Sequence, residues 1–353
     1  GNEHLLHGSR GWGWRHYAVG EKISRSSCFP IRSRYALVLW VLVSKRAVPQ
    51  RAISEQVEMI NMQEKVSVVV TTKNEEKNIA NCLKSIKLQS WSNVEIIVVD
   101  NASSDDSCEM MKSRFPNIKL IENKENLGFP KGNNIGVAEA KGEYICILNP
   151  DTVVAEDTFA KVITRFETIS SEVGIIGCKL IDGTGNFLPE SKRGVPTPWV
   201  AFTKIFGLYK LFPNSSWFNQ YYAQHLNEDQ SGEVDILVGA FMVVKRSLYL
   251  EIGGFDENCF MYSDDIDLSY IVKKLGKQNY YFADTTVIHY KGESTVRDGL
   301  YMKRFREAMQ FFYKKHFKKQ YAGKPTKKYL RIMEQIQQTE SIPYHEIEMA
   351  LLG

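Results

Sequence analysis

The sequence predicts an α/β fold in which an open and mostly parallel sheet is flanked by helices. Three observations predict this class. Apolar, β-branched runs alternate with helical stretches between residues 66 and 150. The runs are apolar at successive positions, which is typical of strands buried on both faces. A strand, a helix and a second strand at this spacing indicate right-handed βαβ units and hence parallel pairing.

The elements are expected in a regular order. The first half alternates strands and helices, with strands at 66–72, 94–100, 118–123 and 143–149 and helices at 75–89, 103–115 and 130–140. The second half is less regular, with strands at 173–181, 234–246 and 280–290 and helices at 158–169, 264–275 and 301–321. Residues 187–230 are aromatic and contain prolines. Such a long irregular stretch indicates a functional loop or a lid.

The charge distribution narrows the classes of partner. The 353-residue chain carries a net charge of +4, yet residues 66–300 are net acidic while both flanking segments are net basic. An acidic core argues against a nucleic-acid groove, whereas basic ends suggest an anionic surface such as membrane lipid. No apolar run approaches the roughly 18 residues that a membrane-spanning helix needs.

The cysteines argue against two kinds of site. The six residues are scattered, without a CxxC pair or a Cys/His cluster, at Cys28, Cys82, Cys108, Cys146, Cys178 and Cys259. This spacing supports neither a zinc site nor a redox motif. It favours unpaired thiols in a reducing cytoplasm.

The turn after the first predicted strand, Thr71 to Glu76, contains no glycine. A dinucleotide-binding fold needs a glycine-rich turn there so that the backbone can approach the pyrophosphate. The P-loop pattern GxxxxGK[ST] is also absent from the sequence. These two facts argue against an oxidoreductase and a P-loop NTPase. A diphosphate ligand would then need a divalent metal held by carboxylates.

Five motifs between residues 66 and 295 occur in an order that resembles a known family. They read VSVVVTTKNEEKNI, IIVVDNASSDDS, NKENLGFPKGNNIGV, YICILNPDTVV and GGFDENCFMYSDDIDLSYIVKKLG. Together they resemble family 2 glycosyltransferases of the GT-A fold, in particular the bacterial rhamnosyltransferase-like enzymes of cell-surface polysaccharide synthesis. The resemblance does not cover residues 1–61 or 322–353.

The resemblance implies a donor-binding set at the strand ends and in the segment 126–134. Its members are Thr71, Thr72, Asn74, Glu76, Asp100, Asn126, Gly128, Lys131, Asn134 and Asn149. Asp100 matches the carboxylate that hydrogen-bonds the nucleotide base. Residues around Gly128 match the segment that approaches the donor sugar and the diphosphate. The alternatives are a helix cap for Asp100 and a solvated surface position for Lys131.

The resemblance also implies a Mg²⁺ or Mn²⁺ site. Asn149-Pro150-Asp151 matches the family's DxD metal motif, with Asn at the first position, and Asp151 is the expected ligand. His289, at the end of a predicted strand, matches a position that can complete the metal or diphosphate site. Asn, Pro and Asp are also turn formers, and a strand histidine is often simply hydrogen-bonded.

The acceptor side is implied by two further matches. Gly239 and Ala240 match the turn under the acceptor site. Asp264 and Asp265 match the family's Glu-Asp motif, which makes Asp265 the expected catalytic base. A carboxylate can take the proton of an acceptor hydroxyl while the bond to the sugar forms. Acids in a first helical turn also stabilise any helix, so a purely structural role is the alternative.

The expected organisation follows. Residues 1–61 are a disordered or non-native extension. Residues 62–298 form the GT-A domain, with a nucleotide-binding half at 62–151 and an acceptor half at 152–298. Residues 299–353 are a basic helical extension. Its helix at 301–321 suggests peripheral contact with an anionic membrane, and a solvated packing helix is the alternative.

The expected function is inverting transfer of a sugar such as rhamnose from a nucleotide-diphosphate donor. The acceptor is a hydroxyl of a cell-surface glycan or a polyprenyl-linked lipid, and nucleic acid is not a partner. The location is the cytoplasm or the cytoplasmic face of the inner membrane. Two other functions fit the motifs: a catalytically inactive GT-A domain that binds or scaffolds, and a sugar nucleotidyltransferase.

Overall fold

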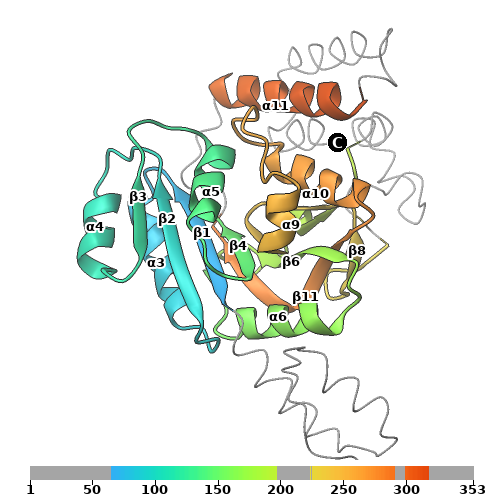
Figure 1. The fold of residues 1–353 in the computed structure, drawn as a ribbon, viewed down its shortest axis with the longest axis horizontal. Coiled ribbons are helices and arrows are strands. Elements are labelled where there is room, and N and C mark those ends of the chain that lie inside the picture. Colours follow the sequence, from blue (N-terminus) through green and yellow to red (C-terminus); the bar gives the residue numbers. More distant parts are fainter. Residues whose placement is uncertain (1–64, 197–222, 224, 291–298, 318–353) are drawn as a thin grey trace, which may run out of the picture. The chain divides into compact units, whose positions relative to one another are not determined.

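The computed structural model describes residues 65–196, 223, 225–290 and 299–317, and every structural statement below refers to these residues. The predictions for residues 1–61, 197–222 and 318–353 lie outside them. The described chain forms a mixed α/β fold around one large sheet, whose strand order is β3-β2-β1-β4-β10-β6-β11-β5, with β8 also paired to β11 (Figure 1).

The first half of the sheet is parallel, as predicted. It consists of β1 (Val66–Thr72), β2 (Val94–Asp100), β3 (Lys119–Glu122) and β4 (Tyr144–Leu148). The strands β2 and β4 flank β1, and β3 lies beyond β2, all in parallel register. The carboxyl ends of these strands therefore meet at one edge of the sheet, where α/β proteins bind their ligands.

The second half of the sheet is mixed. Its strands are β5 (Thr152–Val154), β6 (Val173–Ile181), β8 (Gly232–Val234), β10 (Phe241–Lys245) and β11 (Gln278–His289). The strand β10 runs antiparallel to both β4 and β6, whereas β11 runs parallel to β6 and antiparallel to β5. The change of direction at β10 places the start of that strand beside the end of β4.

Helices cover both faces, which explains why the strands are apolar at successive positions. One face packs against α3 (Glu76–Lys87), α4 (Ser107–Arg114) and α6 (Thr158–Thr168). The other packs against α5 (Phe129–Ala138), α9 (Arg246–Glu251) and α10 (Asp264–Lys274). Within β1, Val68 and Val70 belong to the first core and Val69 to the second.

Two predicted elements differ from the structure. The predicted strand at 234–246 is broken, because β9 (Ile236–Leu237) leaves the large sheet and pairs with β7 (Lys192–Arg193), and Gly239 turns the chain into β10. The predicted helix at 103–115 begins only at Ser107. The polar residues at 103–106 belong to the preceding loop, where the Ser103 N–H donates to Asp100 Oδ2 at 2.8 Å.

The basic helix α11 (Gly299–Phe317) packs against α10. Its side chains Ala308, Phe312 and Phe317 are buried, and the Phe312 ring meets the Tyr270 ring edge-on. The helix thus packs against the protein, and its contact with a membrane stays a prediction. No helix in the described part of the chain has the length and apolar character needed to cross a bilayer.

Candidate active site

Adjacent strand ends present three buried polar groups that nothing in the described protein satisfies. Thr72 and Asp100 face each other in the β1–β2 register. The Oγ1 atoms of Thr71 and Thr72 and the Oδ1 atom of Asp100 are buried without a hydrogen-bond partner among the described residues. An unsatisfied buried polar group costs about 1–3 kcal/mol. Three such groups at one edge indicate a place built to receive a polar ligand.

The loops after β1 and β2 hold each other. Lys73 Nζ donates to the carbonyl oxygens of Asn101 and Ala102, at 3.2 and 2.8 Å. Asn74 Oδ1 accepts from the Ser104 N–H at 2.8 Å, which occupies the side chain that the sequence assigned to the donor. Glu76 is exposed at the start of α3, and its own N–H donates to Asp105 Oδ2 at 3.1 Å.

The end of β4 leads to the predicted metal motif. The Asn149 N–H donates to the Ala240 carbonyl oxygen at 3.0 Å, which connects the motif to the start of β10. Thr152 pairs with His289 across β5 and β11, so His289 comes to the side of Asp151. Asp151 Oδ1 and His289 Nε2 lie 3.4 Å apart, and both side chains are nearly buried. The structure thus brings together the two residues that the sequence predicted as metal ligands.

This pair fits a metal that is shared with a ligand. His289 Nδ1 is buried without a partner among the described residues. Within the described ranges no group of three or more His, Cys, Asp or Glu side chains could hold a metal ion alone. Mg²⁺ binds in this way through one or two carboxylates together with substrate phosphates. Asp151 and His289 would therefore suit an ion that is also bound by the phosphate groups of a ligand.

The predicted base, Asp265, is fixed on both oxygens. Its Oδ2 accepts from Arg193 Nη2 at 2.6 Å and from the Gly239 N–H at 3.0 Å. Its Oδ1 accepts from the Ile266 N–H at 2.7 Å. The Arg193 and Asp265 side chains are only 6% and 12% exposed, so this ion pair is buried.

The neighbouring acid, Asp264, has a raised pKa. It is buried at the start of α10, beside Asp265. Burial, and then the negative charge of Asp265, raise the pKa of Asp264 to about 7. The protonated form of Asp264 therefore persists to a higher pH than that of an ordinary aspartate.

Gly239 and Ala240 join the two motifs. Gly239 donates to the acid pair, and Ala240 accepts from Asn149 of the metal motif. A Cβ atom on Gly239 would lie 3.3 Å from Asp265 Cβ, so a side chain here would crowd the acid. The predicted metal motif and the predicted acceptor side are therefore neighbours across a single turn.

The predicted donor loop contacts the loop that precedes the acid pair. Gly128 has a φ of +83°, and a Cβ atom there would lie 2.7 Å from the Phe260 carbonyl oxygen. The exposed Asn126 holds this turn, since its Oδ1 accepts from the Gly128 N–H at 3.0 Å. Close packing by protein thus accounts for Gly128, a glycine that the sequence assigned to the donor.

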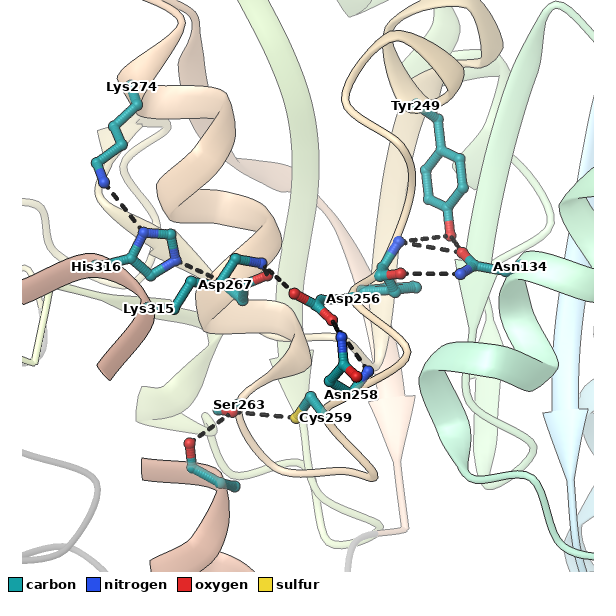
Figure 2. A network of polar contacts seen from close by, with 12 residues as sticks. Asn134, Tyr249, Asp256, Asn258, Cys259, Ser263, Asp267, Lys274, Lys315 and His316 are labelled. Carbon is teal, nitrogen blue, oxygen red and sulfur yellow. Dashed lines mark hydrogen bonds and ion pairs between the residues drawn. The ribbon is translucent and has the colours of Figure 1, made fainter. Parts of the chain in front are cut away.

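Two further predicted donor residues lie on α5. Lys131 is exposed there. Asn134 is engaged with the protein, because its Oδ1 accepts from the Tyr249 hydroxyl at 2.7 Å and its Nδ2 donates to the Phe255 carbonyl oxygen at 2.9 Å (Figure 2). A donor role for Asn134 stays a prediction without support from these contacts.

Arg193 is the site residue that sequence reasoning missed. It lies in β7, within the stretch predicted to be irregular, and it is buried. No periodicity or motif marks it, and 72 positions separate it from Asp265. Only the pairing of β7 with β9 brings it to the acid pair.

Residues 67–253, more than half of the chain, match the family model described as glycosyl transferase family 2. The chain belongs to this family. It is therefore a glycosyltransferase, as the sequence motifs predicted.

Two relatives of this glycosyltransferase are themselves named as sugar transferases. An N-acetylglucosaminyl-diphospho-decaprenol L-rhamnosyltransferase of Mycobacterium tuberculosis is 26% identical over 251 residues, 67% of this chain and 80% of the relative. A low-salt glycan biosynthesis hexosyltransferase of Haloferax volcanii is 25% identical over 217 residues, 60% of this chain and 63% of that protein.

Solved structures of low identity share the GT-A fold with this glycosyltransferase, which confirms the predicted fold class. A mannosyltransferase of Pyrobaculum calidifontis, in complex with GDP-Man and Mn²⁺, matches with a TM-score of 0.52 and 18% identity over 75% of this chain and 73% of that chain. GalNAc-T7 with UDP, GalNAc and Mn²⁺ gives 0.51 and 16% over 71% of this chain and 50% of that chain.

Proposed function

We propose that this glycosyltransferase moves a sugar from a nucleotide-diphosphate donor to a hydroxyl of a glycan or polyprenyl-linked acceptor, with inversion at the anomeric carbon. One observation carries the proposal: unsatisfied groups at Thr71, Thr72 and Asp100 share a sheet edge with the Asp151–His289 pair. Relatives named for a decaprenol-linked acceptor and for glycan biosynthesis support the acceptor class.

The donor is proposed to lie along the strand ends. The free Oδ1 atom of Asp100 is an acceptor for an N–H of the nucleotide base, and the Thr71 and Thr72 hydroxyls can bond the base or the ribose. Asp151 and His289 would hold Mg²⁺ or Mn²⁺ together with the diphosphate. The bound ion would supply positive charge where negative charge develops on the leaving diphosphate.

The acid pair is proposed to act on the acceptor. Asp265 takes the proton of the acceptor hydroxyl as that oxygen attacks the sugar C1 from the face opposite the diphosphate. Arg193 and the Gly239 N–H hold the Asp265 carboxylate in place, and the neighbouring Asp264 is buried beside it. The C1–oxygen bond to the diphosphate breaks as the new bond forms, so a single displacement inverts the anomeric centre.

A rhamnose donor such as dTDP-rhamnose is the first to test, because the Mycobacterium relative is named as an L-rhamnosyltransferase. A lipid-linked acceptor would place the enzyme at a membrane surface. Retention of the protein on liposomes of anionic lipid at low salt tests such peripheral contact. If the liposomes do not retain the protein, the proposal of membrane contact is wrong.

Thermal stability of the full chain with UDP, dTDP and GDP, each with and without Mn²⁺, tests the donor site. A ligand at 100 times its Kd stabilises the folded state by about 2.7 kcal/mol. We expect one nucleotide to stabilise only with Mn²⁺, and Asp151→Ala to lose this effect.

Asp284→Ala is the matched control, because Asp284 is an exposed acid on β11, the strand that ends at His289. Stabilisation that needs no metal would contradict the metal site. The absence of any nucleotide effect would favour a GT-A scaffold without donor binding.

A further inference from the structure

Lys315 of α11 bridges the two ends of the segment that carries the acid pair. Its Nζ donates to Asp256 Oδ2 and to Asp267 Oδ2, each at 2.7 Å. Asp256 begins the loop that leads to α10, and Asp267 lies two residues beyond Asp265. One ammonium group therefore closes the 256–267 segment at both ends (Figure 2).

The middle of the same segment is also bonded to α11. Ser263, the residue before α10, donates from its hydroxyl to the Ala308 carbonyl oxygen at 3.0 Å. Cys259 Sγ lies 3.1 Å from the same hydroxyl. Figure 2 shows Cys259 and Ser263 joined to a backbone group of α11 in this way. The acid pair thus follows directly after a residue that α11 holds.

Both carboxylate oxygens of the buried Asp267 are bonded to side chains of α11. Its side chain is 2% exposed, and its other oxygen, Oδ1, is held by His316 Nε2 at 2.5 Å. Lys274 Nζ lies 3.1 Å from His316 Nδ1, so the ammonium donates to that nitrogen and Nε2 carries the proton given to Asp267. Removing one partner of a buried charge leaves the other charge uncompensated.

The pKa values of Lys315 and Asp256 favour the charged forms of both groups. Burial alone favours the neutral amine, but the hydrogen bonds to Asp256 and Asp267 outweigh it and raise the pKa of Lys315. At Asp256, burial is outweighed by the same contact together with hydrogen bonds from Asn258, and the pKa of that carboxyl is lowered. The Lys315 ammonium and the Asp256 carboxylate are therefore charged at neutral pH, and charge-assisted hydrogen bonds are about twice as strong as neutral ones.

We infer that Lys315 is a positioning residue for transfer: it holds Asp264 and Asp265 in their working orientation by closing the 256–267 segment onto α11. The inference rests on the proposed function for its catalytic consequence. The family match ends at residue 253, so neither the acid pair nor the Lys315 bridge lies within the matched residues. A misplacement of about 1 Å can cost roughly 100-fold in rate, which is the scale on which such a bridge acts.

Two measurements on the full chain test the inference. The first is amide hydrogen exchange over 256–267. The second is release of nucleoside diphosphate from dTDP-rhamnose, UDP-N-acetylglucosamine and GDP-mannose with Mn²⁺, with water in place of the acceptor. The variants are Lys315→Met, which removes the charge, and Lys315→Arg, which can donate to both carboxylates through separate nitrogens.

Asp256→Asn is a milder variant, because it weakens one arm of the bridge and leaves the buried Asp267 paired. Lys314→Met is the matched control, since Lys314 is the exposed neighbour on the same helix.

We expect Lys315→Met to speed exchange over 256–267 while exchange in β1 and β2 stays unchanged. We expect kcat for donor hydrolysis to fall about 10- to 100-fold, with the donor KM within about twofold, because the bridge is not part of the proposed donor site. Lys315→Arg should recover most of the rate, Asp256→Asn should be intermediate, and Lys314→Met should match the parent.

Unchanged exchange over 256–267 in both Lys315→Met and Asp256→Asn would overturn the inference. An unchanged kcat in these variants would overturn it as well, and so would a loss of kcat that Lys315→Arg fails to recover. If the parent releases no nucleoside diphosphate from any of the three donors, the proposed function fails separately, and exchange over 256–267 alone decides whether Lys315 holds the segment.

Discussion

Arg193 and Asp265 form a buried ion pair, with Arg193 Nη2 2.6 Å from Asp265 Oδ2. The pair joins the short β7–β9 sheet to the first turn of α10. A buried pair of this kind contributes little net stability, but loss of one partner is strongly destabilising because a charge is left buried. The pair therefore links folding stability to the placement of the proposed base.

Replacement of Arg193 by Met is expected to lower the free energy of unfolding by about 3–5 kcal/mol, because Asp265 stays buried without its counter-ion. Urea unfolding measures this loss. The double variant Arg193→Met with Asp265→Asn should recover part of it, since neither charge remains.

The matched control is Lys161→Met, which breaks the surface pair of Lys161 with Asp157, where both side chains are 44% exposed. That change should cost about 0.5 kcal/mol or less. A loss below about 1 kcal/mol for Arg193→Met would contradict the buried pair.

Asp265→Asn is expected to abolish transfer while nucleotide binding with Mn²⁺ stays nearly intact. The amide keeps the shape of the side chain but cannot accept a proton from the acceptor. General-base catalysis contributes about 10²–10⁴-fold, so kcat should fall by at least about 100-fold. Turnover together with thermal stabilisation by the nucleotide measures both effects. If transfer and binding were lost together, Asp265 would not be the base.

Asp264 gives a pH dependence with a defined sign. Its pKa is raised from 3.8 to about 7 by burial and by the charge of Asp265. The folded state therefore keeps a proton that the unfolded chain releases, and the stability from this proton is lost as the pH rises from about 4 to about 7. Asp264→Asn has no such loss.

The free energy of unfolding of Asp264→Asn should therefore exceed that of the parent by an amount that grows between about pH 4 and about pH 7. Above that range the difference should level off at roughly 2–4 kcal/mol. Urea unfolding at pH 5, 6, 7 and 8 measures the difference between the two proteins. A difference that stays constant with pH would contradict the raised pKa.

His289→Ala is expected to raise the Mn²⁺ concentration needed for half-maximal stabilisation by the nucleotide. Loss of a residue that supports a metal site typically weakens binding about 10–100-fold. A Mn²⁺ titration of the melting temperature at fixed nucleotide measures the change. His225→Ala is the matched control, because His225 is exposed and bonds the Glu233 carbonyl oxygen. Equal Mn²⁺ requirements for both variants would remove His289 from the metal site.

The strands and helices of the first half could be predicted from the sequence alone. Their residues are apolar at successive positions because both faces of the sheet are covered, and the pattern is local. The order of the motifs also predicted the family and the fold. The family motifs indicate both Asp151 and His289 as metal ligands, and the structure places the two side chains side by side.

Local sequence patterns could not predict the strand pairing in the second half of the sheet or the contacts of every predicted site residue. The run at 234–246 looks like one strand, but β9 and β10 pair with different partners, and pairing energy depends on residues far away in the sequence. Gly128 and Asn134 match donor-site motifs, yet both are engaged by the loops around Phe255 and Phe260.

The sequence by itself determined the parallel half of the sheet, the family and the identity of the acids in and before α10, because these depend on local periodicity and ordered motifs. Only the tertiary structure decided which groups neutralise those acids. Arg193 reaches Asp265, and Lys315 reaches Asp256 and Asp267, across separations of 48 to 72 positions. Such ion pairs form because folding buries opposite charges beside each other. The paired residues are far apart in the sequence, so no local pattern predicts the pairing.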